Sequence, residues 1–173
     1  MNAVVITVSD SCSCGQREDR SGPEVAARLR HAGFTVNVVL IIPDEQEQIA
    51  QTLRQQATEA QLVVTTGGTG ITARDCTPEA TRSVCDRIVE GFGERMRSEG
   101  LKDTPLAPLS RAVTGTLGAT LIVNVPGSPT AAVQSLEAVL PLIPHALALL
   151  SGHTGHPQDN HHPATPGDHT RVR

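Results

Sequence analysis

Four short apolar runs, all rich in β-branched residues, constrain the fold of this chain more than any other feature of its sequence. Each run is continuous rather than alternating with polar positions, which is typical of strands that are covered on both faces. Segments of helical length lie between the runs, and this alternation predicts a largely parallel sheet between layers of helices. The runs cover residues 4–8, 36–42, 62–66 and 121–125.

Helix-start and helix-stop residues place the first two helices. The first opens at Gly22-Pro23 and ends at Gly33, because proline suits the first helical position and glycine suits the C-terminal cap. The second covers residues 45–60, where apolar side chains recur on one stripe of the helix.

Three further helices follow from the same signals. The third opens at Thr77, which we expect to be the N-cap. The fourth is short and covers residues 92–99. The fifth opens at Ser128, and Pro141 and Pro144 should break or kink it.

Residues 112–125 predict a hairpin. Two β-like runs meet there at Leu117-Gly118, so one strand of the sheet should run antiparallel to the rest. The fold class that we expect is α/β: a three-layer α/β/α sandwich whose sheet is mostly parallel and has one antiparallel strand.

The composition excludes several classes of protein. The chain has no Trp, no Tyr and two Phe, which are too few aromatic side chains for a platform that stacks single-stranded nucleic acid. Its net charge of −4 argues against binding to the phosphates of a duplex. No apolar run approaches the roughly 20 residues of a membrane span, and the N-terminus does not resemble a secretory signal. We therefore expect a cytoplasmic protein that binds neither nucleic acid nor membrane.

The composition changes after residue 150. We expect one α/β domain over residues 1–150 and a His/Pro-rich tail over residues 151–173, where five of the seven histidines fall. The tail has too few apolar residues to order itself, although His161-His162 leaves transition-metal binding open. Cys12-x-Cys14 leaves the same alternative open, against free thiols in a reducing compartment.

Polar or glycine-rich segments follow every predicted strand of the parallel sheet. Ligands of open α/β sheets bind beyond the carboxyl ends of the strands, so these segments should converge at one edge. In chain order they are Ser9-Asp10-Ser11, Pro43-Asp44-Glu45, Gly67-Gly68-Thr69-Gly70 with Arg74-Asp75, and Pro126-Gly127-Ser128.

The segment at residues 67–70 has the chemistry of an anion-binding loop. Glycine lets the backbone approach a phosphate and direct N–H groups at it, and the hydroxyls of Thr66 and Thr69 add donors. Ser128 precedes a helix whose N-terminus carries about half a positive charge. The spacing matches neither the P-loop nor the dinucleotide fingerprint. A tight turn without a ligand is the alternative interpretation.

Asp44 and Asp75 each allow two interpretations. Asp44-x-x-Glu47 resembles a capping box, and Asp75 could pair with Arg74 or cap the helix at Thr77. Alternatively, both carboxylates serve catalysis. Mg²⁺ is held by one or two carboxylates together with phosphate oxygens, so two acids beside a phosphate-binding loop suggest a magnesium-dependent nucleotide or phosphoester enzyme.

The central segment TTGGTGITARDCTPEAT closely resembles the signature of the molybdenum-cofactor biosynthesis family that contains the Mog and MoaB proteins and the G domains of gephyrin and its plant counterpart. The resemblance covers nearly all of residues 3–150. Four other segments agree with it in the family's order: SDSCSCGQREDRSGPEVAARL, IIPDEQEQI, LSRAVTG and NVPGSPTAAVQSLEAVLPLIPHAL.

The resemblance implies a reaction and an assembly. Family enzymes use Mg-ATP to adenylylate molybdopterin, releasing pyrophosphate, and a partner protein then inserts molybdate. Family members form homotrimers, and MoaB-type members can form hexamers. Two alternatives stay open: a MoaB-type protein that binds molybdopterin without catalysis, and a nucleotide-pyrophosphate hydrolase, since the competence-damage-inducible family has a related fold.

The resemblance also implies roles for individual residues. Asp44 and Asp75 correspond to the two acids that the family needs for catalysis, and we expect them to hold Mg²⁺. The loop at residues 67–70 would hold phosphate. Ser110 and Ser128 would line the pterin side of the site, with Gly127 beside them, and Ser9 and Asp10 would lie on the nucleotide side.

Overall fold

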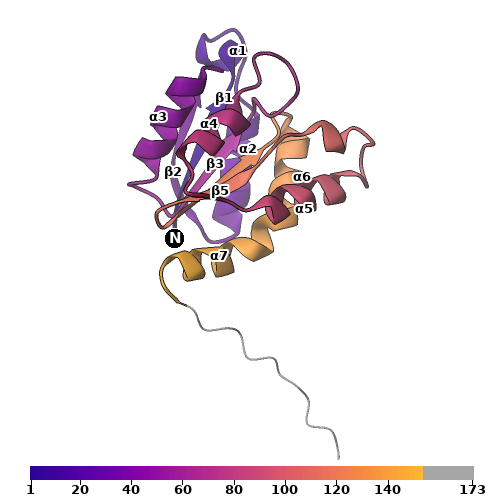
Figure 1. The fold of residues 1–173 in the computed structure, drawn as a ribbon. Coiled ribbons are helices and arrows are strands. Elements are labelled where there is room, and N and C mark those ends of the chain that lie inside the picture. Colours follow the sequence, from indigo (N-terminus) through magenta and orange to yellow (C-terminus); the bar gives the residue numbers. More distant parts are fainter. Residues whose placement is uncertain (154–173) are drawn as a thin grey trace, which may run out of the picture.

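A computed structural model of the chain describes residues 1–153 and shows one mixed sheet with helices on both faces (Figure 1). The predicted tail at 151–173 lies almost wholly outside the described residues, as does its histidine pair at 161 and 162. The domain boundary at residue 150 therefore stays a prediction.

The sheet has six strands, of which β5 alone runs against the others. β1, β2, β3 and β6 pair in parallel, whereas β5 pairs antiparallel with both of its neighbours. The predicted fold class and the hairpin are confirmed, and the two-residue strand β4 is an addition that the sequence pattern did not predict. From edge to edge the order is β2 (Thr35–Ile42), β1 (Asn2–Val8), β3 (Leu62–Thr66), β6 (Thr120–Val125), β5 (Thr114–Leu117) and β4 (Arg87–Ile88).

The predicted helices all form, and the structure adds a short helix, α1, directly after β1. Pro141 and Pro144 interrupt the last helix as expected, because a 3₁₀ turn separates α6 from α7. In chain order the helices are α1 (Asp10–Ser13), α2 (Ser21–His31), α3 (Gln46–Gln56), α4 (Thr77–Val84), α5 (Glu90–Gly100), η1 (Ala107–Leu109), α6 (Pro129–Val139), η2 (Leu140–Leu142) and α7 (Ile143–Leu150).

Two apolar clusters cover the two faces of the sheet. α2, α5, α6 and α7 pack on one face against the side chains of Val5, Val64 and Val123. α3 and α4 pack on the other face, against the strand residues that alternate with these, such as Val63 and Ile122. Successive residues of a strand point to opposite faces, so the continuous apolar runs arise because both faces are buried.

The edge strand β2 is an exception to this expectation. It is bordered by a strand on one side only, and Val38 and Ile41 are each more than two-fifths exposed. Helices shield the central strands more completely than they shield this edge, so the apolar run at 36–42 is not covered on both faces.

Two local predictions are wrong. Cys76 rather than Thr77 is the N-cap of α4, and the Thr77 hydroxyl instead donates to the carbonyl oxygen of Gly67 at 2.9 Å. The second wrong prediction is that no apolar run approaches the length of a membrane span. The segment Pro129–Leu150, with 22 residues and a mean hydropathy of 1.5, is long and apolar enough to cross a membrane by length and composition. Its residues Leu136, Ile143 and Leu147 are buried in the apolar cluster on the sheet, whereas Leu142 and Leu149 are exposed.

Candidate functional site

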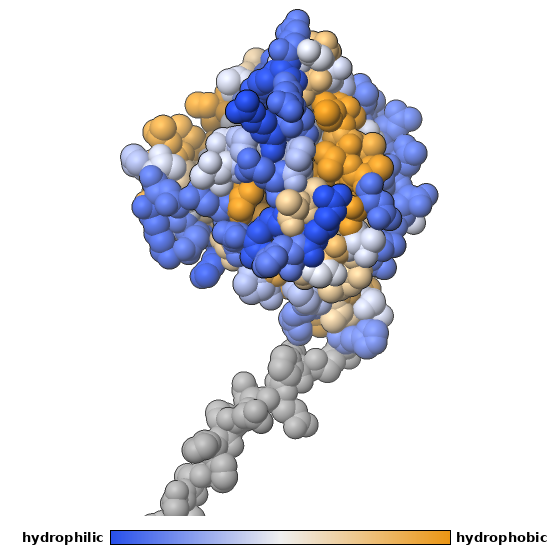
Figure 2. Space-filling model, turned by 180° about the vertical axis from the view of Figure 1, so that it is seen from behind, coloured by the Kyte–Doolittle hydropathy of each residue, from blue (hydrophilic) through white to orange (hydrophobic). Residues whose placement is uncertain are grey.

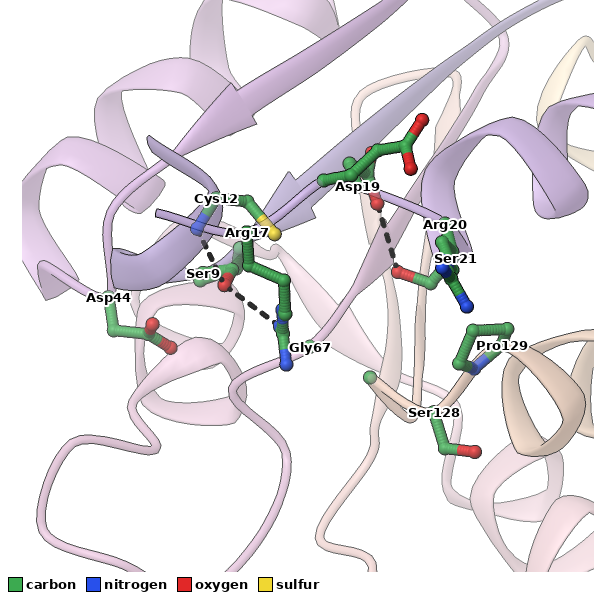
Figure 3. A pocket seen from close by; sticks show the side chains of 13 residues that line it. Ser9, Cys12, Arg17, Asp19, Arg20, Ser21, Asp44, Gly67, Ser128 and Pro129 are labelled. Atoms are coloured by element: carbon green, nitrogen blue, oxygen red, sulfur yellow. Dashed lines mark hydrogen bonds between the residues drawn. The ribbon is translucent and has the colours of Figure 1, made fainter. Parts of the chain in front are cut away.

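A cavity of about 640 Å³ opens beyond the carboxyl ends of β1 and β3 and at the start of α6 (Figure 3). This is the edge of the sheet at which the sequence predicts a ligand. Five of the predicted site residues line the cavity, and they come from four separate segments of the chain: Ser9, Asp44, Gly67, Gly127 and Ser128.

The other predicted site residues do not line the cavity. Thr66 and Thr69 are buried, and the Thr66 hydroxyl donates to the Pro126 carbonyl oxygen at 2.7 Å. This bond joins the end of β3 to the segment after β6. Thr66 therefore holds the cavity wall in place, and its hydroxyl is already engaged.

Ser110 lies apart from the main cavity. It lines two neighbouring hollows of about 280 Å³ and 380 Å³, which lie along α5 and the segment before β5. The structure therefore does not bring Ser110 together with Ser128 in one cavity.

Gly67 and Gly68 are required by close backbone approach. Gly67 has a φ of +103°, and a Cβ there would lie 2.2 Å from the carbonyl oxygen of Val8. Gly68 has a φ of +61°, and a Cβ there would lie 2.3 Å from the Thr77 hydroxyl and 2.9 Å from Oδ1 of Asp44. The glycines thus let the loop lie directly against β1, α4 and the Asp44 carboxylate.

Asp44 and Asp10 bind each other's backbone. The Asp10 N–H donates to Oδ2 of Asp44 at 2.9 Å, and the Asp44 N–H donates to Oδ1 of Asp10 at 3.0 Å. Glu45, not Asp44, is the N-cap of α3, and it makes no side-chain capping bond. The capping-box interpretation of Asp44 is therefore wrong, and its carboxylate lies beside the glycine loop instead.

Arg74 joins the glycine loop to this pair. Its guanidinium donates to both carboxylate oxygens of Asp10 at 3.0 Å and to Glu45 at 2.9 Å. The hydrogen bond from Arg74 lowers the pKa of Asp10 below its usual range. Arg74 is occupied by these two acids, so it does not form the predicted pair with its neighbour Asp75.

Burial raises the pKa of Asp44, and the nearby charges of Asp10 and Asp75 raise it further. Burial also opposes ionisation of Asp75, but hydrogen bonds from Thr72 and Gly70 outweigh it and lower the Asp75 pKa. The Thr72 N–H donates to Oδ2 of Asp75 at 2.8 Å. Asp75 therefore neither pairs with Arg74 nor caps α4.

The glycine loop separates the two acids. Asp44 lies against Gly68 and Asp75 lies against Gly70, where a Cβ would come within 2.9 Å of each carboxylate. Asp44 lines the cavity, whereas Asp75 does not. The charge of Asp75 nevertheless reaches Asp44, because it contributes to the raised Asp44 pKa.

The segment between α1 and α2 supplies cavity residues that the sequence interpretation did not single out. Arg17, Arg20 and Asp19 line the cavity, and Arg17 donates to the Ser9 hydroxyl at 3.2 Å (Figure 3). Asp19 precedes Arg20, the N-cap of α2, and accepts from the N–H of Gly22 in the first turn of that helix at 3.1 Å. Arg17 and Arg20, which follow the first strand in the sequence, could have indicated an anion-binding segment.

A metal ion at this site would need ligands besides protein side chains. In the part of the chain that the structure describes, no three His, Cys, Asp or Glu side chains gather closely enough to hold one. Asp44 and Asp75 could therefore contribute to a Mg²⁺ site only together with phosphate oxygens or water, which is how Mg²⁺ is usually held.

Comparison with known proteins identifies the family. Residues 4–145 match the family described as "Probable molybdopterin binding domain". The chain is 42% identical over 154 residues to the molybdopterin adenylyltransferase of Helicobacter pylori strain J99, covering 86% of each chain. It is 39% identical to gephyrin of Dictyostelium discoideum over 158 residues, which are 85% of this chain and 22% of gephyrin.

Solved structures share the fold. The MoaB protein of Thermus thermophilus is 46% identical, with a TM-score of 0.82 over 87% of this chain and 96% of that chain. A MogA structure is 32% identical, with a TM-score of 0.83 over 87% of this chain and 99% of that chain.

Proposed function

The chain belongs to the family of probable molybdopterin-binding domains, and on that premise we propose that it adenylylates molybdopterin in molybdenum cofactor biosynthesis. Its curated relatives named molybdopterin adenylyltransferase are matched over most of their length. The observation that carries the proposal is the position of the Asp44 carboxylate, which lies between the glycine loop and the cavity that opens at the start of α6.

The reaction joins two anions. An oxygen of the terminal phosphate of molybdopterin attacks the α-phosphorus of ATP, a new P–O bond forms, and the bond between the α-phosphorus and the bridging oxygen breaks. Pyrophosphate carries the bonding electrons away. The protein must therefore offset the repulsion between the two phosphate groups before it can promote the transfer.

Three features of the cavity serve this purpose in our proposal. The backbone of the loop at residues 67–70 approaches the ligand closely because glycines occupy it. The 11-residue helix α6 begins at the cavity wall beside Ser128 and directs its positive dipole end towards bound phosphate. Arg17 and Arg20 line the cavity together with the intervening Glu18 and Asp19, and their guanidinium groups are suited to bind phosphate oxygens.

Asp44 and Asp75 are the residues that would hold Mg²⁺. Both carboxylates lie against the glycine loop, and two carboxylates with phosphate oxygens suit this cation. When bound, Mg²⁺ neutralises charge on the triphosphate. The two acids place that charge beside the loop, where the phosphates bind.

The two substrates would occupy different sides of the site. We assign Ser9 and Asp10 to the nucleotide side and Ser110, Gly127 and Ser128 to the pterin side. Ser9 lines the cavity together with Arg17, which suits a polyphosphate. Because Ser110 lines separate hollows, the pterin would have to extend from the main cavity towards the segment before β5.

The proposal includes a cytoplasmic homotrimer, or a hexamer, that passes its product to a molybdate-insertion protein. Apolar surface supports self-association. Figure 2 shows apolar residues gathered in patches among hydrophilic ones on the face seen there. Leu142 and Leu149, both more than two-fifths exposed, line an apolar groove of about 420 Å³ along α7.

Direct assay of the product tests the function. The purified chain is incubated with molybdopterin, ATP and Mg²⁺, and adenylyl-molybdopterin and pyrophosphate are measured. Equal amounts of the two products support the proposal. Binding of molybdopterin without product would favour a MoaB-type binding protein without catalysis. Release of AMP without pterin would favour a nucleotide-pyrophosphate hydrolase.

A further inference from the structure

Arg111 makes three contacts with one short segment and the helix after it. Its Nε donates to the carbonyl oxygen of Gly70 at 2.6 Å, and its Nη2 donates to the carbonyl oxygen of Asp75 at 2.6 Å. Its Nη1 pairs with the carboxylate of Glu79 on α4. One guanidinium therefore joins the first and last residues of the segment at 70–75, which carries Asp75.

The backbone of this segment depends on these donors. Among the described residues, no backbone N–H donates to the carbonyl oxygens of Gly70 or Asp75. Within the segment, the Asp75 N–H donates to the Thr72 carbonyl oxygen at 3.1 Å, and the Thr72 N–H returns a bond to the Asp75 carboxylate. The segment thus forms a small closed turn whose two ends are bridged from outside by Arg111.

Arg111 is itself fixed in position. Its N–H donates to the carbonyl oxygen of Thr69 at 2.9 Å, so its backbone lies alongside the glycine loop. Glu79 neutralises the guanidinium, and the side chain is only 36% exposed. The planar fork of arginine can reach two carbonyls in fixed directions at once, which the single ammonium of lysine cannot do.

We propose that Arg111 is the positioning residue that holds the segment at 70–75 closed and thereby fixes the Asp75 carboxylate beside the glycine loop, where the proposed function places the triphosphate. The inference rests on the proposed function for its catalytic consequence, but its structural part is independent of that function. Arg111 does not line the main cavity; it binds the backbone of the segment, and its charge also helps to lower the pKa of Asp75.

The test compares Arg111→Met with a matched control, Arg82→Met. Arg82 is an exposed arginine on α4 whose guanidinium binds Glu90 and not the segment. Amide hydrogen exchange of peptides covering residues 70–76 is measured for both variants and the unchanged chain. Loss of two charge-assisted hydrogen bonds should speed exchange of these peptides at least about tenfold in Arg111→Met, with no change in Arg82→Met.

Two milder variants of the same contact serve as controls in case Arg111→Met does not fold. Glu79→Gln removes the charge that fixes the guanidinium and should give a smaller acceleration, and Arg111→Lys should recover only part of the protection. In the enzyme assay at saturating molybdopterin, kcat of Arg111→Met should fall at least about tenfold, and Arg111→Lys should recover part of that loss. Saturating molybdopterin is used because Arg111 lines the same hollow as Ser110, so its removal can also change the affinity for the pterin.

Unchanged exchange at 70–76 in all three variants of this contact, or equal acceleration in Arg82→Met, overturns the inference. Faster exchange with an unchanged kcat overturns it as well, because the closed segment would then not serve catalysis. If the unchanged chain forms no adenylyl-molybdopterin, the proposed function fails, and the exchange comparison alone decides whether Arg111 holds the segment closed.

Discussion

Replacement of Gly67 by alanine should destabilise the fold more than replacement of another glycine with positive φ. Gly67 has a φ of +103°, and its added Cβ would lie 2.2 Å from the carbonyl oxygen of Val8. Relief by movement is restricted, because the Gly67 N–H donates to the carbonyl oxygen of Val125 at 3.2 Å and the Gly67 carbonyl oxygen accepts from the Thr77 hydroxyl at 2.9 Å. Gly118 is the matched control: its φ is +56°, and no atom lies within 4 Å of its ideal Cβ.

The structure gives the size of the difference. Left-handed backbone costs an alanine about 1–2 kcal/mol, and this cost applies to both variants. Only Gly67→Ala adds overpacking against backbone, which costs about 1–3 kcal/mol. For a domain of this size, each kcal/mol lowers Tm by roughly 2–4 °C. Gly67→Ala should therefore unfold at a temperature roughly 2–12 °C below that of Gly118→Ala.

Thermal unfolding followed by circular dichroism measures this difference, with urea unfolding as a check that m is unchanged. A Tm for Gly67→Ala equal to or above that of Gly118→Ala would refute the reasoning. In that case the loop could move away from β1 at no cost, and the close approach of the two segments would not define the cavity.

Three further outcomes follow from the electrostatics of the site and the environments of the thiols. Asp75→Asn should lower kcat at least about a hundredfold while molybdopterin affinity, measured by titration calorimetry, stays within a few fold; loss of pterin binding in a folded variant would contradict the assigned roles. The pKa of Asp44 is raised by burial, so stability is lost as the pH rises from the unfolded-state pKa to the folded-state pKa, and the loss is complete above the latter. Asp44→Asn should therefore raise Tm at pH 7 in EDTA, with the gain disappearing towards pH 3, and an unchanged or lower Tm at pH 7 would contradict this. Burial raises the pKa of Cys85 to about 11, so at pH 8 exposed Cys14 should react with a thiol reagent well before Cys85, and peptide mapping that finds Cys85 labelled first would contradict it.

The sequence predicts the framework of the site because that framework depends on local patterns. The runs at 62–66 and 121–125 are buried throughout because helices cover both faces of these strands. Parallel strands bring their carboxyl ends to one edge, so Ser9, Asp44 and Gly67 could be expected together from the sequence alone. Their assembly into one cavity needs only strand direction and strand order.

The contacts that orient individual side chains could not be predicted in the same way. Asp44-x-x-Glu47 has the spacing of a capping box, yet the Asp44 carboxylate accepts from the Asp10 N–H, which is 34 residues away in the chain. Thr77 precedes Pro78 as an N-cap would, yet its hydroxyl donates to Gly67. In both cases a partner from another segment replaces the local one, and the local pattern carries no information about that partner.

The two arginines near the glycine loop show why the contacts within the site are the ones that local sequence patterns do not predict. Arg74 ties the loop to Asp10 and Glu45, and Arg111 bridges Gly70 and Asp75 from a segment more than thirty residues further along the chain. A loop with several glycines loses more conformational entropy on ordering than other loops do, so contacts from other segments are needed to hold its shape. The backbone and hydroxyl of Thr77 and the backbone of Val125 hold the glycines, and the two arginines restrain the residues that follow them. The residues that make the loop recognisable in the sequence are therefore different from those that hold it in its working conformation.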